Sequence, residues 1–293
     1  MKNALLVLLA LILVGTGVAA LSAPASAPDA KPLAAAKPDA VALRAGHNFI
    51  PTPAAATEEE DLKVLELFKG LRVADVVDGM DAVGLQDIGL MSSEIKPLWR
   101  DTEHYAHRIC GIAVTARYVP TNRPPAGLRP EAEFDTWVGQ WYKEIAPETF
   151  TEIIRKGAVV VIEGAEGADV GPVGSNNILG WKLKGCLGVV TNTTARDTDE
   201  IATEKVPLYY KQPGRGIRPG RIELESVNRP VSCGGALVVP GDVVVADGDG
   251  VVVVPRAKAE DVARYARKIL DGDKRGRRGL YQKLGLPEDD SVR

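Results

Sequence analysis

An arginine and an aspartate stand next to each other at positions 196 and 197, shortly after an apolar run that ends at Thr191. The planar guanidinium of Arg196 is matched to a carboxylate, to which it can donate two parallel hydrogen bonds. The carboxylate of Asp197 is an oxygen ligand of the kind that Mg²⁺ prefers, and one or two such ligands suffice because this cation keeps several waters. The pair therefore indicates either a site for a metal ion and an acidic substrate or an ordinary surface ion pair.

Two apolar runs and the segment between them are the elements that would position this pair. Residues 158–162 and 187–191 are short and rich in β-branched side chains, which predicts strands buried on both faces. Residues 178–184 have the length of two helical turns, so the unit is a strand, a helix and a second, parallel strand. Ligands of open α/β sheets bind outside the carboxyl ends of the strands, where Arg196 and Asp197 would lie.

The rest of the chain predicts further helices and strands of an α/β protein. Hydrophobic periodicity indicates helices at 58–69, 73–83 and 257–270, an aromatic-rich helical segment at 134–156, and strands at 109–117 and 206–210. Four short apolar runs are separated by glycine- and aspartate-rich turns and predict an antiparallel meander, at 229–233, 236–239, 243–246 and 251–254.

Two other groups of residues have the types of metal ligands but a weaker pattern. Asp75, Asp78 and Asp81 recur every three residues and would share one face of a helix, which is more often solvated than metal-bound. His104 and His107 would also share a helical face. No third ligand lies near them in the sequence, so we do not expect a metal site there.

Basic side chains gather in two places. The loop at 211–221 carries Arg215, Arg218 and Arg221 among glycines and prolines, and it could either hold an anion or be an ordinary exposed loop. The run at 274–278 follows the last predicted helix, and we expect a solvated end there rather than a contact with nucleic acid.

Composition argues against several classes of function. The chain has 293 residues, of which 45% are apolar and 26% charged, with a net charge of −3, so no general affinity for nucleic acids is implied. Aromatic residues make up only 5%, which argues against a base-stacking surface. Three scattered cysteines, Cys110, Cys186 and Cys233, are too few for a disulfide framework or a metal cluster. We expect buried free thiols, although one disulfide could form.

Residues 1–27 have the pattern of a secretion signal. Lys2 precedes an apolar segment that runs to Leu21, and small residues then offer cleavage sites up to Ala27. We expect a protein exported to the periplasm or secreted, with no membrane contact after cleavage. The alternative is an uncleaved N-terminal membrane anchor. Residues 28–57, rich in alanine and proline, would form a linker.

Several motifs, spread in order over residues 70–285, match one known family. They are Ala74-Asp-Val-Val-Asp78, Cys110-Gly-Ile-Ala-Val-Thr115, Gly188-Val-Val, Arg196-Asp-Thr-Asp-Glu200, Pro230-Val-Ser-Cys-Gly-Gly235 and the run from Pro240 to Pro255. They resemble the RraA-like family, which includes 4-hydroxy-4-methyl-2-oxoglutarate aldolases and a regulator of ribonuclease activity. The resemblance implies a single α/β domain of the swivelling β/β/α type with a mixed sheet, at 58–285, followed by a tail at 286–293. It also implies a homotrimer, or a homohexamer of two stacked trimers, with active sites between neighbouring subunits.

The resemblance also implies catalytic residues. Arg196, Asp197 and Glu200 match the pattern of the family's aldolases, in which an Arg-Asp pair is followed by an acid. By that match Asp197 holds a divalent metal, Mg²⁺ or Mn²⁺, mostly through waters, and Arg196 binds the carboxylate of pyruvate. Ser175 stands where the aldolases carry a leading aspartate, so one part of the pattern is absent.

The turn before the predicted helix would complete the substrate site. In the family's aldolases, backbone amides just after the leading aspartate help to hold pyruvate. The corresponding turn here consists of Gly174, Ser175, Asn176 and Asn177, and the amides would be those of the two asparagines.

These residues imply a metal-dependent lyase of the class II aldolase or oxaloacetate decarboxylase kind, acting on a pyruvate-containing 2-oxo acid. Retro-aldol cleavage and decarboxylation of a β-keto acid pass through the same enolate, so this site does not distinguish them. The alternative is a non-catalytic binding or regulatory protein of the same family. The Arg196-Asp197 pair favours the enzyme, and Ser175 favours the alternative.

Overall fold

The computed structural model describes residues 39–293 except 125, 126 and 128, so the predicted signal sequence lies outside the described residues. The chain divides into two compact units at residues 49 and 50. The described part of the first unit holds one helix, α1 (Ala40–Ala45), within the segment that we expected to be a linker. Among the described helices, none combines the length and the apolar character needed to cross a bilayer.

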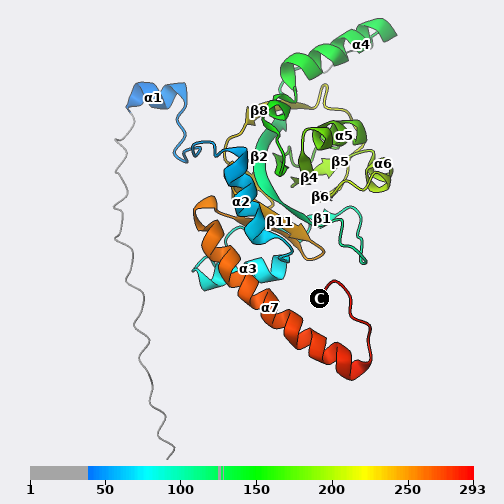
Figure 1. Cartoon of the computed structure of the whole chain (residues 1–293). Coiled ribbons are helices and arrows are strands. Elements are labelled where there is room, and N and C mark those ends of the chain that lie inside the picture. The colour runs from blue at the N-terminus through cyan, green and yellow to red at the C-terminus, as the bar shows by residue number, and fades with distance from the viewer. Residues whose placement is uncertain (1–38, 125–126, 128) are drawn as a thin grey trace, which may run out of the picture. The chain divides into compact units, whose positions relative to one another are not determined.

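The second unit is built on an eight-stranded mixed sheet (Figure 1). Its strands lie in the order β1 (Lys96–Pro97), β6 (Leu208–Tyr210), β4 (Cys186–Thr191), β3 (Ala158–Glu163), β2 (Ile109–Pro120), β11 (Val243–Asp247) and β12 (Gly250–Val254). The eighth strand, β8 (Ile222–Val227), pairs with the second half of β2. Strands β2, β3, β4 and β6 are parallel, which confirms the predicted parallel pairing of β3 with β4.

Strand β3 is buried on both faces, as its β-branched run predicts. Val160 and Ile162 belong to the core cluster that also contains side chains of α5 (Ser175–Leu183) and α6 (Thr198–Thr203). Val159 and Val161 point to the opposite face and belong to a separate cluster with β11 and β12. Because neither face meets water, the strand can consist almost entirely of valine and isoleucine.

Three helices pack together against the part of the sheet formed by β11 and β12 (Figure 1). They are α2 (Glu58–Phe68), α3 (Val73–Ala82) and α7 (Ala259–Leu284).

The aromatic-rich segment forms three short helical elements, α4 (Glu131–Gln140), a π-helical turn η1 (Trp141–Ile145) and a 3₁₀ helix η2 (Thr149–Ile153). A further 3₁₀ turn, η3 (Arg256–Lys258), precedes α7. Two short strands, β5 (Thr194–Ala195) and β7 (Gln212–Pro213), pair in parallel outside the main sheet.

The predicted four-stranded meander is wrong. Strands β9 (Val231–Cys233) and β10 (Ala236–Val238) form a separate hairpin, and only β11 and β12 join the main sheet. Asp242 accepts hydrogen bonds from the backbone N–H groups of Val239 and Arg256, both at 2.9 Å, and so fixes a sharp change of direction after β10. The chain then pairs β11 with the first half of β2 instead of with β10.

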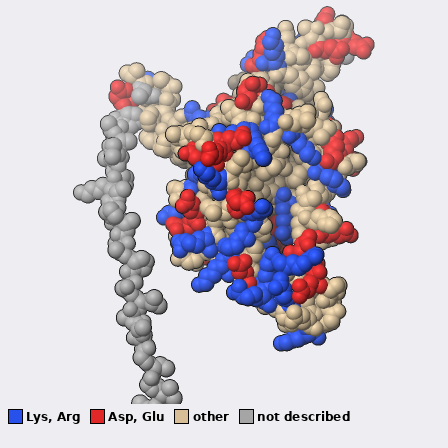
Figure 2. Space-filling view, viewed as in Figure 1, with Lys and Arg blue, Asp and Glu red and all other residues tan. Residues whose placement is uncertain are grey.

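The last helix is longer than predicted, because α7 continues from residue 270 to Leu284. The basic run at 274–278 is therefore part of a helix, and the C-terminal segment folds back onto it. Arg277 donates to Ser291 Oγ at 2.8 Å, Arg278 donates to the carbonyl of Val292, and Val292 is fully buried. Figure 2 shows lysine and arginine side chains gathered on the lower half of the face in view, with acidic side chains among them.

Candidate active site

The chain after β3 and the chain after β4 meet at the carboxyl end of the parallel strands. The backbone N–H of Arg196 donates to the carbonyl of Val173 at 3.0 Å. A Cβ atom at Gly171 would lie only 2.7 Å from Cβ of Arg196, so glycine is required for this approach. Helix α5 begins directly after the contact, at Ser175 and therefore three residues before the predicted start.

Asp197 has a left-handed backbone conformation, with φ of 55°, at the position before α6. Its side chain does not cap α6. Instead, Oδ2 of Asp197 accepts a hydrogen bond of 3.2 Å from the backbone N–H of Ser175, the first residue of α5. Aspartate tolerates this conformation better than most residues, and the conformation turns its carboxylate toward the neighbouring helix.

Gly174 leaves open the space in which the predicted site residues meet. A Cβ atom at this position would lie 2.6 Å from Oδ2 of Asp197, 3.2 Å from Oδ1 of Asn177 and 3.6 Å from Nε of Arg196. The structure therefore brings Gly174, Ser175, Asn177, Arg196 and Asp197 together, although they come from two separate segments.

The side chains of two predicted site residues, Glu200 and Asn176, are not among those that meet at Gly174. Glu200 is exposed in the first turn of α6, and no hydrogen bond or ion pair joins its side chain to Arg196 or Asp197 within the described residues. Asn176 has an exposed side chain, so its possible contribution is its backbone. For the backbone N–H groups of Asn176 and Asn177, no acceptor lies within the described part of the chain. Such free N–H groups at the start of a helix carry a partial positive charge that attracts an anion.

The Arg196–Asp197 pair is loose and open to solvent. Nε of Arg196 lies 3.6 Å from Oδ1 of Asp197, and the two side chains are 36% and 35% exposed. An exposed ion pair of this kind contributes only about 0–1 kcal/mol to stability. Both side chains therefore keep donors and acceptors that a ligand could use.

The donor set suits a hard cation that keeps its waters. Asp197 offers carboxylate oxygens next to open space, and Mg²⁺ or Mn²⁺ needs few protein ligands. Within the described residues, no group of three or more His, Cys, Asp or Glu side chains could enclose a metal ion. The site therefore fits a largely hydrated divalent cation and does not fit a structural zinc ion.

Glu148 is a residue at this site that the sequence analysis missed. It lies between η1 and η2, and its carboxylate accepts hydrogen bonds from Nδ2 of Asn177 at 2.6 Å and from Nε1 of Trp181 at 3.0 Å. Its third partner is Arg218, at 2.5 Å. Asn177 and Arg218 are 29 and 70 residues away in the sequence, so no local pattern could have indicated the contact.

The three arginines of the loop at 211–221 have different environments. Arg218 is almost fully buried and ion-paired, so it belongs neither to an exposed loop nor to an open anion site. Arg215 is exposed and pairs with Asp169. Arg221 is exposed and donates to the carbonyl of Ile217 at 3.1 Å.

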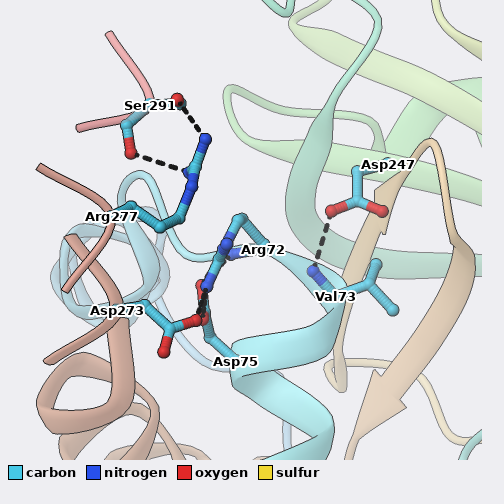
Figure 3. Close-up of polar contacts among 7 residues, drawn as sticks. All are labelled: Arg72, Val73, Asp75, Asp247, Asp273, Arg277 and Ser291. Carbon is cyan, nitrogen blue, oxygen red and sulfur yellow. Dashed lines mark hydrogen bonds and ion pairs between the residues drawn. The ribbon is translucent and has the colours of Figure 1, made fainter. Parts of the chain in front are cut away.

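The predicted solvated face of three aspartates is wrong in one respect. Asp78 and Asp81 are exposed, but Asp75 is fully buried, where its carboxylate caps α3 and pairs with Arg72 (Figure 3). The two histidines do not share a helix. His104 is exposed, whereas Nδ1 of the buried His107 accepts from the backbone N–H of Asp101 at 3.1 Å. Burial, with a smaller effect of Arg108, lowers the pKa of His107.

The three cysteines are free thiols, as predicted. Burial raises the pKa of Cys186 to about 11 and those of Cys110 and Cys233 to about 12. Because the thiolate is the reactive form, these cysteines are poor nucleophiles and poor metal ligands at neutral pH.

Comparison with known proteins matches this chain to one family. A family model named RraA-like and described as Aldolase/RraA matches residues 73–253. An uncharacterized protein of Methanocaldococcus jannaschii is 35% identical over 106 residues, which are 36% of this chain and 50% of that protein. A protein of Halalkalibacterium halodurans named "Putative 4-hydroxy-4-methyl-2-oxoglutarate aldolase" is 31% identical over 126 residues, 42% of this chain and 59% of the relative. The alignments thus span only half to three fifths of these relatives.

Solved structures show the same fold at low sequence identity. Streptomyces coelicolor RraAS2, described as an unusual member of the RNase ES inhibitor RraA protein family, superposes with a TM-score of 0.59 at 22% identity. The match covers 77% of this chain and 99% of that one. A protein from Pseudomonas syringae gives a TM-score of 0.58 at 23% identity, over 81% of this chain and 97% of the other. The predicted mixed α/β fold of the RraA type is therefore confirmed.

Proposed function

The chain belongs to the RraA-like family, and we propose that within it this protein is a divalent-metal-dependent lyase acting on a pyruvate-containing 2-oxo acid. One observation carries the proposal. Asp197 and Arg196 meet the first turn of α5 around the open space at Gly174, where the carboxylate of Asp197 lies 3.2 Å from the backbone nitrogen of Ser175. A cation ligand, a carboxylate-binding arginine and free backbone N–H groups are thus gathered at one point.

Each part of the site has a distinct role in this proposal. Arg196 and the backbone N–H groups of Asn176 and Asn177 bind and orient the carboxylate of the substrate. Asp197 holds Mg²⁺ or Mn²⁺, mostly through waters. When bound, the cation polarises the ketone of a 2-oxo acid and stabilises the negative charge that C–C cleavage leaves on the pyruvate fragment.

Two reactions are compatible with these roles. Retro-aldol cleavage of a substrate like 4-hydroxy-4-methyl-2-oxoglutarate and decarboxylation of oxaloacetate both leave a pyruvate fragment at the site. The name of the Halalkalibacterium halodurans relative supports the first reaction. Glu200 stays a candidate for the proton transfer, although within the described residues its side chain makes no hydrogen bond or ion pair with Arg196 or Asp197.

We further propose that the protein is exported and that it assembles as a homotrimer or a homohexamer. Leu179 and Leu183 lie one turn apart on α5 and are 38% and 91% exposed, and Leu187 on β4 is 42% exposed. Exposed leucines on α5 and at the start of β4 support a neighbouring subunit that covers them. Light scattering at micromolar concentration should give the mass of three or six chains, and a monomeric mass would contradict this assembly.

A non-catalytic binding protein is the second candidate. It is favoured by Ser175, whose hydroxyl stands where the family's aldolases have a carboxylate. Asp197 is consequently the one acidic side chain among the residues that meet at Gly174. Such a protein would bind a 2-oxo acid at Arg196 without turning it over.

The test is oxaloacetate decarboxylation with Mg²⁺, with Mn²⁺ and with EDTA. We expect metal-dependent turnover that Asp197→Asn abolishes, since asparagine tolerates the left-handed backbone but removes the charge that holds the cation. Asp273→Asn is the matched control, because Asp273 also pairs with an arginine and is 53% exposed, but belongs to α7. If the wild type shows no turnover and its Mg²⁺ binding is unaffected by Asp197→Asn, the binding protein is the correct description.

A further inference from the structure

The carboxylate of Glu148 joins three parts of the chain that are distant in sequence. It belongs to the short link between η1 and η2 and accepts from Asn177 and Trp181, which both lie on α5. It also pairs with Arg218, from the loop between β7 and β8. Three donors on one carboxylate leave it little freedom to reorient.

Arg218 fixes the position of Glu148. The Arg218 side chain is only 6% exposed, and it also donates to the hydroxyl of Tyr118 at 3.0 Å and to the carbonyl of Ala146 at 3.2 Å. Its Cζ lies 4.6 Å from the centre of the Tyr142 ring. A buried guanidinium requires a nearby negative charge, and Glu148 is the carboxylate that supplies it in the described part of the chain.

Glu148 in turn holds α5 at two points. Asn177 and Trp181 are four residues apart, so they lie one above the other on the same face of the helix. Two contacts one turn apart restrict both the rotation of the helix about its axis and its tilt. The first of them lies in the turn that carries the free N–H groups of Asn176 and Asn177.

Few other contacts of α5 could hold this turn. Of its nine residues, Ile178 and Trp181 are buried, and the residue before the helix is Gly174, which has no side chain to cap it. Besides the burial of Ile178, the first turn is held by two polar contacts, Asn177 with Glu148 and the backbone of Ser175 with Asp197. The second of these would change if Asp197 took up a cation, whereas the first would remain.

We propose that Glu148, held in place by Arg218, is the positioning residue of this active site. It keeps the first turn of α5 oriented so that the N–H groups of Asn176 and Asn177 face the carboxylate of the ligand beside Arg196. The identity of that ligand rests on the proposed function, but the positioning of the helix does not. The aromatic segment that includes η1 and η2 is thereby coupled to the site.

Hydrogen exchange in Glu148→Gln, followed by mass spectrometry, tests this positioning without reference to activity. Glutamine keeps the shape of the side chain but loses the charge, so the amides at 175–181 should exchange about ten times faster than in the wild type. Glu163→Gln is the matched control, because Glu163 is also paired with an arginine at 3.0 Å, has a side-chain exposure of 19% against 20% for Glu148, and lies on β3. The control should leave exchange in α5 unchanged.

Calorimetry with oxalate in the presence of Mg²⁺ tests the consequence for binding. We expect about tenfold weaker oxalate binding in Glu148→Gln and wild-type binding in Glu163→Gln. If Glu148 acts through Asn177, Asn177→Ala should weaken oxalate binding by itself and add little when combined with Glu148→Gln. If Glu148→Gln does not fold, Asn177→Ala replaces it, because this variant keeps the Arg218–Glu148 pair. Hydrogen exchange in α5 and oxalate binding are then measured on Asn177→Ala.

The outcomes separate this inference from the proposed function. Unchanged exchange in α5 for both Glu148→Gln and Asn177→Ala would overturn the positioning role, whatever the activity. Faster exchange with unchanged oxalate binding would overturn the claim that the positioning serves the ligand. Faster exchange in a wild-type protein that neither binds oxalate nor turns over a 2-oxo acid would leave the positioning of α5 intact and contradict the proposed lyase.

Discussion

Two arginine–aspartate pairs of this protein, Arg72–Asp75 and Arg196–Asp197, have the same chemistry in opposite environments. Arg72 binds Asp75 through two nitrogens, at 2.9 and 2.5 Å, and the Asp75 side chain is 1% exposed (Figure 3). Arg196 and Asp197 make one contact of 3.6 Å, and both side chains are about a third exposed. In the first pair, both carboxylate oxygens of Asp75 accept hydrogen bonds from Arg72, whereas in the second pair a single long contact leaves the carboxylate of Asp197 accessible.

The neighbours of each pair explain the difference. Asp75 accepts from the backbone N–H of Arg72, and Arg72 also reaches Asp273 on α7, at 2.7 Å (Figure 3). These contacts join α3 to α7 and engage the buried carboxylate of Asp75 within the fold. Around Arg196 and Asp197 the neighbours are a glycine and the free N–H groups of a helix start. An arginine–aspartate pair thus stabilises the fold where it is enclosed and can bind a ligand where it is open.

The largest expected effect is on the stability of the enclosed pair. Asp75→Asn removes the charge that neutralises Arg72 and should lower the free energy of unfolding by about 3 kcal/mol. That is the lower end for a broken buried pair, because Asp273 still faces Arg72. Chemical denaturation checks the change. A loss below about 1 kcal/mol would mean that the two pairs differ less than their geometry indicates.

Arg196→Lys should have the next largest effect, on binding by the open pair. An ammonium group cannot reproduce the two parallel hydrogen bonds of a guanidinium with a carboxylate. We expect oxalate binding, measured by calorimetry with Mg²⁺, to weaken by about 1.5–3 kcal/mol, which is about ten- to a hundredfold. Unchanged affinity would show that Arg196 does not contact the ligand.

Ser175→Asp sharpens the comparison by adding a second carboxylate to the open pair. The new charge would lie at the start of α5, beside Asp197, and should attract Mg²⁺ with an additional energy of about 1 kcal/mol, or about fivefold in affinity. It should also raise 4-hydroxy-4-methyl-2-oxoglutarate cleavage relative to oxaloacetate decarboxylation. If the Mg²⁺ affinity and the ratio of the two activities both stay at their wild-type values, Ser175 does not limit metal binding or cleavage at the site.

The smallest expected effect is the change in stability of Asp197→Asn. Because the pair is exposed and loose, the free energy of unfolding should change by less than about 1 kcal/mol. Asparagine also accepts the left-handed backbone at this position, so no strain is added. Chemical denaturation of Asp197→Asn and the wild type measures this change. A loss similar to that of Asp75→Asn would indicate that Asp197 is structural.

Sequence patterns predicted the parts of this structure that depend on neighbouring residues. Strands β3 and β4 and the helix between them follow from local composition, and their parallel pairing follows from the length of the connection. The juxtaposition of Ser175 with Asp197 could be anticipated because Ser175 lies between β3 and the predicted helix and Asp197 follows β4, both at the carboxyl ends of the strands.

Features set by distant contacts could not be read in the same way. The meander failed because β11 pairs with β2, more than a hundred residues away, rather than with the strand before it. The role of Glu148 depends on Arg218, and the burial of Asp75 depends on the packing of α3 against α7 and the sheet. Burial of a polar side chain is decided by such packing and not by its own periodicity.

A crystal structure of the protein soaked with Mg²⁺ and oxalate tests the central claim most directly. We predict the cation beside Asp197, held mostly through waters, and an oxalate carboxylate bound by Arg196 and by the N–H groups of Asn176 and Asn177. The Arg72–Asp75 pair should be unchanged. Oxalate bound elsewhere, or no cation beside Asp197 at saturating Mg²⁺, would contradict the assignment of the open pair as the active site.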